Sequence, residues 1–290
     1  MDMTMNFLHD GNPETPLKTT FTRGGEAEPN IAEPLPNNRH PGEGRDLPAT
    51  KTALADEDTG LRRHDELLLQ MLSRLNICSK EFISTQYDHN VQGTAVMGPL
   101  QGKGRVYAET SITRPVLTSE KGVVLSQGLF PRYSDIDTAA MAAAGVDLAV
   151  RNASAAGADL NQLALLDNFC WCSSDELERL GQLKRAVEAI YDIAVKYETP
   201  FISGKDSMFN DFKGFDANGE PVKISAPPTL LASSIGVIPN VDRAISLAPK
   251  AVGDVLYLLG ETKDELGASE YYDQHGELGS NVPQVDMGRN

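Results

Sequence analysis

The hydrophobic pattern is most regular between Leu177 and Ala194, where apolar residues recur at steps of three and four. This spacing is typical of an amphipathic helix, because 3.6 residues complete a turn and bring such positions onto one face. Ser173 followed by Glu176 fits a capping box, in which each side chain satisfies a free backbone N–H at the start of a helix. We therefore predict a helix that begins near Ser173 and that Pro200 stops.

Two short apolar runs flank this helix. The first, residues 163–169, ends near the polar pair Asp167 and Asn168, and the second begins at Phe201. We expect the second strand to break into a tight loop at residues 203–207. A strand–helix–strand unit of this length favours a crossover between parallel or near-neighbour strands. Both polar clusters then fall at strand ends, where α/β sheets usually place their ligands.

The rest of the chain predicts further elements of the same two kinds. Leucines and methionines between residues 67 and 75 indicate a short helix, and the alanine-rich stretch 137–156 indicates a buried one. Asn218-Gly219 is a strong signal for a hairpin turn. Additional strands are expected at residues 106–112, 122–129, 228–238 and 254–260.

Composition and charge narrow the class of protein. The formal net charge of -15 argues against a nucleic-acid partner, because a surface that follows phosphates must be basic. No apolar run approaches the length of a membrane span, and the start of the chain lacks the pattern of a signal peptide, so we expect no membrane partner. The three cysteines, Cys78, Cys170 and Cys172, form an odd set without metal spacing. Free thiols in a cytoplasmic protein are the expectation.

The pattern divides the chain into three parts. Residues 1–60 are rich in Pro, Gly and charge and are expected to form a flexible linker, within which 23–59 resembles an insertion. Residues 61–247 carry the strands and helices of one α/β domain. Residues 248–290 begin with an apolar stretch that is expected to open a second domain.

The tetrapeptide Gly204-Lys205-Asp206-Ser207 has the groups best suited to binding a charged ligand. Gly204 allows close backbone approach, Lys205 can neutralise a phosphate, Asp206 can hold a cation and Ser207 can donate a hydrogen bond. Such a set suits a phosphorylated substrate or a nucleotide with its magnesium. A turn capped by Asp and Ser would have the same sequence, so the structural alternative stays open. The motif is not a Walker A loop, because the preceding glycine is missing.

Longer segments carry a family resemblance. The runs LLDNFCW, PFISGKDSMFNDF, PPTLLASSIGVIP and NICSKEFISTQYDHNVQGTAV closely resemble the second half of phosphoribosylformylglycinamidine synthase, as does HGELGSNVPQVD further on. That family belongs to the aminoimidazole ribonucleotide synthetase superfamily of purine biosynthesis. The resemblance extends over about residues 61–286. It implies an α/β (α+β) fold like that superfamily's N-terminal domain, with a mixed sheet and helices on one side, followed by the start of a truncated C-terminal domain.

The resemblance also implies an activity. The family converts formylglycinamide ribonucleotide to the amidine with ATP and magnesium, using ammonia from a glutaminase. The first half of the synthetase, with its catalytic histidine, is not found in this sequence, so we expect a fragment that is inactive alone. Its implied partners are that first half, the glutaminase and the ribonucleotide substrate. Without the first half, an apolar sheet face would be exposed and would favour self-association.

Site residues follow from the resemblance position by position. Asp167 and Gly204 would contact ATP, and Ser207 would contact the substrate. At Lys205 the small form of the enzyme has an asparagine that helps to hold magnesium. A lysine cannot ligate a cation, but it can bind the phosphates of ATP.

The magnesium ligands implied by the resemblance are Asp88 and Asn152, and Asp206 can take over part of the metal role. One departure weakens this set. The family carries a glutamate where this chain has Leu148, and a leucine cannot coordinate a cation.

Two other interpretations remain open. The chain can belong to another branch of the superfamily, such as aminoimidazole ribonucleotide synthetase itself or a selenophosphate synthetase-like kinase. It can also be a non-catalytic nucleotide-binding scaffold or a truncated remnant, which Leu148 and the missing C-terminal domain favour.

Overall fold

The computed structural model describes residues 59–87, 89–90 and 92–288, with only the backbone over residues 59–64. Nearly all of the predicted linker, including its inserted tract, therefore lies outside the described residues. The ligand candidate Asp88 also lies outside them.

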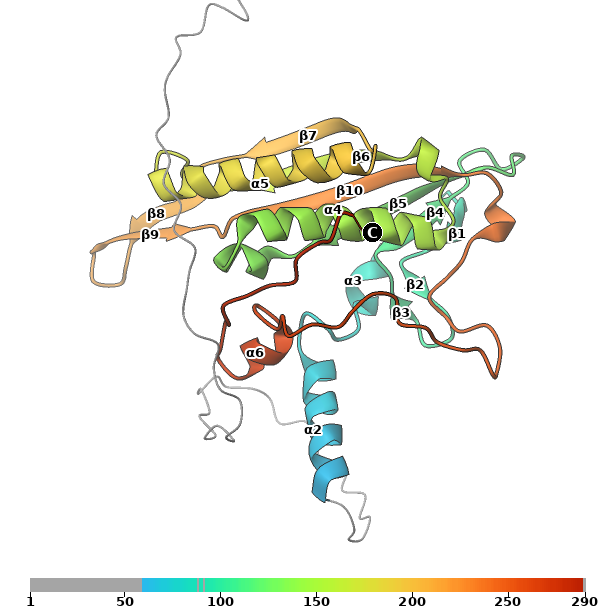
Figure 1. Cartoon of the computed structure of the whole chain (residues 1–290), viewed down its shortest axis with the longest axis horizontal. Helices are drawn as coiled ribbons and strands as arrows, with labels where there is room; N and C mark the ends of the chain where they lie inside the picture. Colours follow the sequence, from blue (N-terminus) through green and yellow to red (C-terminus); the bar gives the residue numbers. More distant parts are fainter. Residues whose placement is uncertain (1–58, 88, 91, 289–290) are drawn as a thin grey trace, which may run out of the picture.

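A mixed six-stranded sheet forms the centre of the fold (Figure 1). The strands β6 and β7 are parallel, and the other pairs are antiparallel. In spatial order the strands are β1 (Ala95–Met97), β4 (Thr110–Thr113), β5 (Gly122–Leu129), β10 (Thr229–Ile238), β6 (Ala164–Cys170) and β7 (Phe201–Ser207). The mixed sheet and the parallel β6–β7 pair confirm the fold class expected from the sequence.

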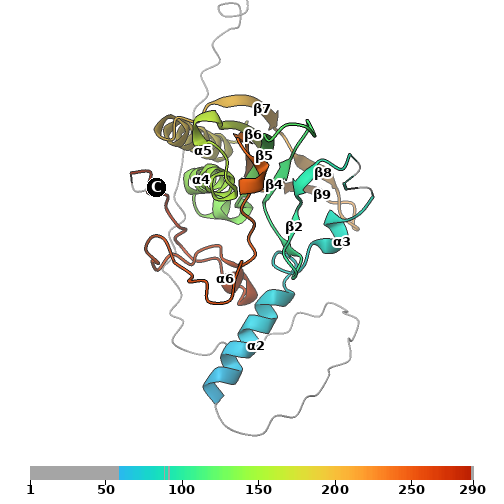
Figure 2. The same cartoon turned by 90° about the vertical axis from the view of Figure 1, so that its right-hand side faces the viewer.

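Two long helices, α4 (Thr138–Ala156) and α5 (Leu177–Lys196), cover one face of this sheet (Figures 1 and 2). The helix α4 begins where predicted, because the Asp137 carboxylate accepts hydrogen bonds from the backbone N–H groups of Ala139 and Ala140. It ends at Gly157, whose φ of 105° suits a left-handed C-cap. The helices therefore lie on one side of the sheet, as expected.

Helix α4 packs unusually close to strand β5. A Cβ placed on Gly128 would lie 2.0 Å from the Gly145 carbonyl oxygen, so the two glycines allow the backbones to touch. Beside them, the buried hydroxyls of Ser126 and Ser234 lie 2.8 Å apart, and both donate to the Ala149 carbonyl. Because the side chains at this contact are small, the helix backbone lies directly against the sheet.

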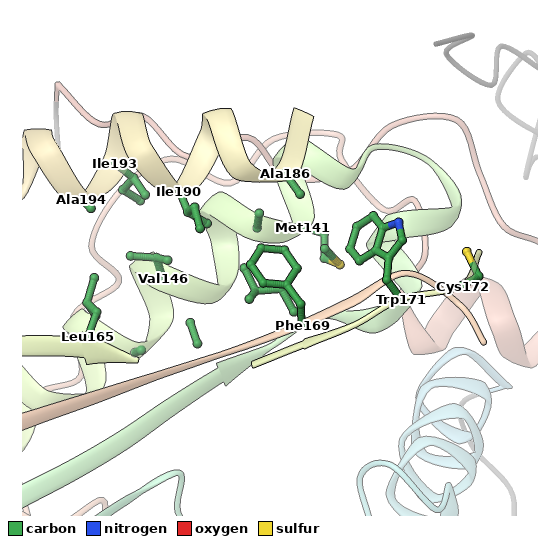
Figure 3. Packing of buried hydrophobic residues seen from close by; sticks show 14 residues of the cluster. Met141, Val146, Leu165, Phe169, Trp171, Cys172, Ala186, Ile190, Ile193 and Ala194 are labelled. Atoms are coloured by element: carbon green, nitrogen blue, oxygen red, sulfur yellow. The ribbon is translucent and has the colours of Figure 1, made fainter. Parts of the chain in front are cut away.

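The main core lies between the helices and strands β6 and β10 (Figure 3). Strand β6 contributes Leu165 and Phe169 to it, and α5 contributes Ile190 and Ile193. Trp171 is fully buried, and its indole N–H donates to the Arg179 carbonyl at 3.0 Å. The core therefore fixes which side of β6 faces the helices.

The predicted capping box at the start of α5 is wrong. Glu176 is itself the N-cap residue and makes no side-chain capping bond. Its carboxylate instead pairs with Lys223, which lies on a distant hairpin strand. A tertiary ion pair has therefore replaced the local hydrogen bond.

The expected loop at residues 203–207 is also wrong. Strand β7 runs without a break to Ser207, in parallel register with β6 from Leu166 onward. Pairing with β6 keeps this segment extended, and it includes a hydrogen bond from the Trp171 N–H to the Ser207 carbonyl at 2.8 Å. Because β7 is an edge strand, its polar side chains reach solvent without cost.

Two further strand predictions need correction. The expected strand 106–112 is divided at Ala108 between β3, in a separate two-stranded sheet, and β4, in the main sheet. Residues 254–260 form no regular element, and Leu256 and Leu259 are both 87% exposed. Among the described strands none pairs with this stretch, so its apolar residues have no sheet to enter.

The remaining elements are short or peripheral. The hairpin predicted at Asn218-Gly219 is present, with a φ of 83° at Gly219. Helix α2 confirms the predicted short helix, although it ends before Leu75. These elements are α2 (Thr59–Ser73), α3 (Glu81–Ser84), β2 (Leu100–Gln101), β3 (Val106–Tyr107), η1 (Pro131–Asp135), η2 (Leu160–Gln162), β8 (Asp211–Phe215), β9 (Pro221–Ser225), η3 (Val241–Arg243) and α6 (Glu270–Gln274).

The end of the chain packs back onto the main domain. Ala268 and Val282 are buried against Ile136 and Ala140. The Arg74 guanidinium, just past α2, pairs with two carboxylates of α6. The division at residue 248 stays a prediction. None of the described helices combines the length and apolarity that crossing a bilayer requires.

The close approach of α4 to β5 generates the first prediction. Replacing Gly128 by alanine places a methyl group against the Gly145 backbone, which cannot yield as a side chain can. We expect a loss of about 1–3 kcal/mol in the free energy of unfolding, measured by urea denaturation. Gly98→Ala is the control, because its Cβ would meet nothing within 4 Å. Equal stability of the two variants would contradict the close packing.

Candidate functional site

The candidate site lies on the parallel ribbon of β6 and β7, where Asp167 sits directly beside Gly204. A Cβ on Gly204 would lie 2.5 Å from the Asp167 Oδ1 atom, so only glycine leaves room for this carboxylate. The backbone N–H of Lys205 donates to the same oxygen at 3.3 Å. The family resemblance implied that Asp167 and Gly204 each contact ATP, and the fold places the two residues side by side.

Asp167 has an unusual environment for a carboxylate. Partial burial raises the pKa of this side chain above its ordinary value, and the negative charge of Asp206 raises it further. The Lys205 N–H acts in the opposite direction but does not cancel these effects. Two carboxylates that repel each other in this way are a suitable pair for a bound cation.

Strand geometry divides the motif between two faces of the sheet. Leu165 and Phe169 point into the core under α5, so Asp167, midway between them, points to the same side. Asp206 lies opposite Phe169 and therefore shares this side. Lys205, which lies opposite Asn168, points to the other face.

Ser207 has a local partner. Its hydroxyl lies 3.1 Å from Asn210 Oδ1, and the Asn210 amide donates to the Ser207 carbonyl at 2.7 Å. The same amide reaches the Cys170 sulfur at 3.4 Å. These bonds orient the Ser207 side chain at the end of β7, which is compatible with either a structural role or a substrate contact. Cys78, Cys170 and Cys172 are all free thiols, as expected.

Asn152 lies on α4 and contacts a different set of groups. Its amide donates to Glu109 Oε2 at 3.2 Å and to the Gln127 carbonyl at 3.4 Å. Leu148, one turn earlier, is half-buried. In the part of the chain that the structure describes, no group of three His, Cys, Asp or Glu residues is arranged to hold a metal. The magnesium set of Asp88, Asn152 and Asp206 therefore stays a prediction.

The sequence did not reveal a cleft of about 590 Å³ on the sheet face away from α4 and α5. Leu129 and Leu231 form part of its floor, and the segment after α2 forms a wall with Lys80 and Arg105. Lys80 donates to the carbonyls of Leu75 and Cys78, and Arg105 pairs with Glu81. No spacing in the sequence signals this cleft, because the fold brings its walls together from distant segments.

A second, larger cavity of about 1090 Å³ lies beside the ends of α4 and α5. The C-terminal segment forms its other wall. Inside, the Asp147 carboxylate accepts from the Tyr197 hydroxyl and from Arg151, both at 2.6 Å. None of the site residues predicted from the sequence lines this cavity.

Comparison with known proteins gives the family. The family model of the FGAR-AT PurM_N-like domain matches residues 79–237, which is more than half of the chain and contains the six-stranded sheet almost completely. The chain belongs to this family. The matched range contains both strands of the Asp167–Gly204 site.

The relatives named as phosphoribosylformylglycinamidine synthase subunit PurL agree with this assignment. The protein of Methanocaldococcus jannaschii is 32% identical over 224 residues, which cover 76% of this chain and 29% of the relative. The protein of Deinococcus radiodurans is 34% identical, with 76% and 28% covered. The chain thus spans less than a third of the length of these relatives.

A solved structure of PurLQS from Thermotoga maritima is similar over 60% of this chain and 25% of its own, with a TM-score of 0.45 and 23% identity. The resemblance to the synthetase family noted from the sequence is confirmed by the family match and the PurL relatives. The role of each site residue is a separate question.

The raised pKa of Asp167 generates a prediction about pH. The folded state holds its proton more tightly than the unfolded state, so this residue lowers stability as the pH rises above the ordinary aspartate range of about 4. We expect Asp167→Asn to raise the melting temperature at pH 7, and the gain to shrink near pH 3, where both states are protonated. Thermal unfolding at the two pH values measures this.

The control for this prediction is Asp192→Asn, which removes the same charge from an exposed position on α5. An equal gain in both variants would show that net charge, and not the environment of Asp167, is responsible.

Proposed function

We propose that this chain is the nucleotide- and substrate-binding domain of the second half of a phosphoribosylformylglycinamidine synthase. The observation that supports this most directly is the contact of Gly204 with the Asp167 carboxylate inside a matched family domain. The full reaction uses ATP to convert formylglycinamide ribonucleotide to the amidine in purine biosynthesis. The amide oxygen takes the γ-phosphoryl group, ammonia adds to the carbon, and phosphate then leaves with that oxygen.

The proposed roles follow from the chemistry of each group. Asp167 and the Gly204 backbone contact ATP, and Lys205 neutralises part of the phosphate charge. Ser207, which Asn210 orients, contacts the substrate. These groups bind and position, and phosphoryl transfer mainly requires positioning and charge stabilisation. None of them forms a covalent bond to the substrate.

Magnesium suits the carboxylate side of the site. Asp167 and Asp206 repel each other, and a hard cation prefers carboxylate oxygens. When bound, magnesium would supply charge neutralisation at the phosphates. Asp206 would hold the ion in part, with Asp88 and Asn152 as the further proposed ligands. A bound cation would lower the pKa of Asp167, which the negative charge of Asp206 raises.

The uncovered sheet face is the proposed surface for the partner half. On this face Leu125 and Leu129 are 42% and 46% exposed, and Ile235 lies opposite Leu125. A surface of this kind favours association with another apolar face. We propose that the partner is a domain equivalent to the remaining part of the PurL relatives, with ammonia supplied by a glutaminase. Alone, the chain would be inactive and would self-associate through this face. The setting is cytoplasmic.

A second candidate function is a nucleotide-binding scaffold without catalysis. Leu148 favours it, because a leucine in α4 removes one implied cation ligand. The two functions differ in whether nucleotide binding depends on magnesium.

The proposed nucleotide site is tested by calorimetry of the purified chain with ATP and ADP. We expect binding to require magnesium and to weaken about tenfold or more in Asp167→Ala, which removes a charged contact. Gly204→Ala should weaken it similarly, because the added methyl group displaces the carboxylate. The control Gly98→Ala should bind normally. Magnesium-independent binding would favour the scaffold, and no binding by a folded chain would contradict a site within this domain.

The proposed partner surface is tested by sedimentation over a range of concentrations. We expect the unmodified chain to self-associate and Leu125→Glu to shift it towards monomer, because the new charge would be buried in the contact. Val187→Glu adds the same charge to the exposed surface of α5 and should change nothing. A monomer at all concentrations would rule out this contact.

A further inference from the structure

The hairpin of β8 and β9 has one charged face and one apolar face. Side chains alternate between the two faces along each strand, and residues directly opposite each other share a face. The register places Phe212 beside Ile224 on one face and Lys213 beside Lys223 on the other. The sequence of the hairpin therefore decides which face can meet an apolar surface.

The charged face is turned towards the protein. The Lys223 ammonium pairs with the carboxylate of Glu176, which precedes α5, and it lies 3.5 Å from the Asp211 carboxylate. The Asp211 side chain is almost completely buried. These contacts hold the hairpin to the start of α5 through polar groups.

The apolar face is left uncovered. Phe212 and Ile224 are 58% and 61% exposed. The Phe212 ring lies along the hairpin, because a Cβ on Gly214 would be 2.6 Å from it, and Val222 completes this face opposite Gly214. Antiparallel sheets usually bury their apolar face and expose the polar one. Here the arrangement is reversed, and none of these four residues belongs to a buried cluster of the described part of the chain.

The hairpin lies beside the uncovered face of the main sheet. It projects beyond the end of the helices in Figure 1, and Figure 2 shows it on the side of the sheet away from α4 and α5. Leu125 and Leu129 are exposed on that side of the sheet. A partner that covers the sheet would therefore also meet the hairpin, a step that rests on the partner surface of the proposed function.

A second copy of this chain matches both surfaces. In a two-fold contact each copy offers the same patch, so the hairpin of one copy can lie on the sheet of the other and the reverse. Each chain has a net charge of -15, which opposes association, but the apolar face of the hairpin carries no charge. Covering this face would also stabilise the hairpin, because two isolated strands are marginally stable in water.

We propose that the β8–β9 hairpin is an association arm, which packs Phe212, Val222 and Ile224 against the uncovered sheet face of a second copy. The ion pair of Lys223 with Glu176 sets the orientation of the arm on its own chain. The apolar side chains provide the contact with the other chain.

The first test measures the dissociation constant of the dimer by sedimentation of the full chain. The variants are Phe212→Glu and Ile224→Glu on the apolar face. Phe215→Glu is the matched control, because Phe215 lies on the same strand, is 73% exposed and points to the opposite face. Circular dichroism confirms that each variant is folded.

We expect each variant of the apolar face to raise the dissociation constant about tenfold or more, because it places an unpaired charge in an apolar contact. Phe215→Glu should stay within about twofold of the unmodified chain, as a surface substitution outside the contact does. Exposure alone would predict the opposite order, since Phe215 is the more exposed residue.

A second test keeps the aromatic side chain and does not depend on a disruptive charge. Phe212 is replaced by the photoreactive analogue benzoylphenylalanine, and Phe215 is replaced in the same way as the control. Isotope-labelled and unlabelled chains are mixed, irradiated and mapped by mass spectrometry, which distinguishes links between copies from links within one. We expect position 212 to link to β5 or β10 of the other copy and position 215 to form no such link.

Several results would overturn the arm. These are a monomer at all concentrations, equal effects of Phe212→Glu and Phe215→Glu, and links from position 212 that stay within its own chain or reach only the other hairpin. A loss of association in Phe212→Glu without any loss in Leu125→Glu would also reject the sheet as the surface that the arm contacts.

The arm and the proposed function can fail separately. If Leu125→Glu weakens association and Phe212→Glu does not, the sheet remains the partner surface and the arm is rejected. If position 212 links to the other copy but the folded chain does not bind ATP with magnesium, the arm is supported and the nucleotide site is rejected.

Discussion

The contact between the backbones of α4 and β5 sets the rest of the architecture. Gly128 and Gly145 remove the Cβ atoms that would hold the helix away, and the Ser126 and Ser234 hydroxyls both reach the Ala149 carbonyl from the sheet. With α4 fixed in this way, α5 packs beside it over the main core. Both helices occupy one face of the sheet, so the other face remains available for a partner.

The packing of β6 and β7 determines where the candidate site residues point. Leu165 and Phe169 are held in the core, and this anchoring determines that Asp167 lies on the helix side. Because β7 is an edge strand, residues 204–206 are exposed and accessible to a ligand. If β7 shifted by one residue relative to β6, Lys205 and Asp206 would exchange faces, because side chains alternate along a strand. The placement of charge is therefore a consequence of core packing.

Local signals predicted those elements whose stability is local. The helix 137–156 was predictable because its many alanines favour a helix locally, and the Asp137 cap that the structure shows is local too. The hairpin at Asn218-Gly219 was predictable from its turn residues. Predictions failed where a distant group competes with a local one. Lys223 takes the Glu176 carboxylate away from the expected capping box, and the ladder with β6 converts the expected loop at Gly204 into a strand.

The sequence by itself determined the family and the α/β class, because these depend on long motifs and on the order of elements, and it named Asp167 and Gly204 as separate candidate ligand contacts. Only the tertiary structure decided that Lys205 and Asp206 face opposite ways and that Asn168 stands beside Lys205. Those facts depend on the register between β6 and β7. Register is set by which side chains enter the core, and a linear pattern of polar residues does not contain that information.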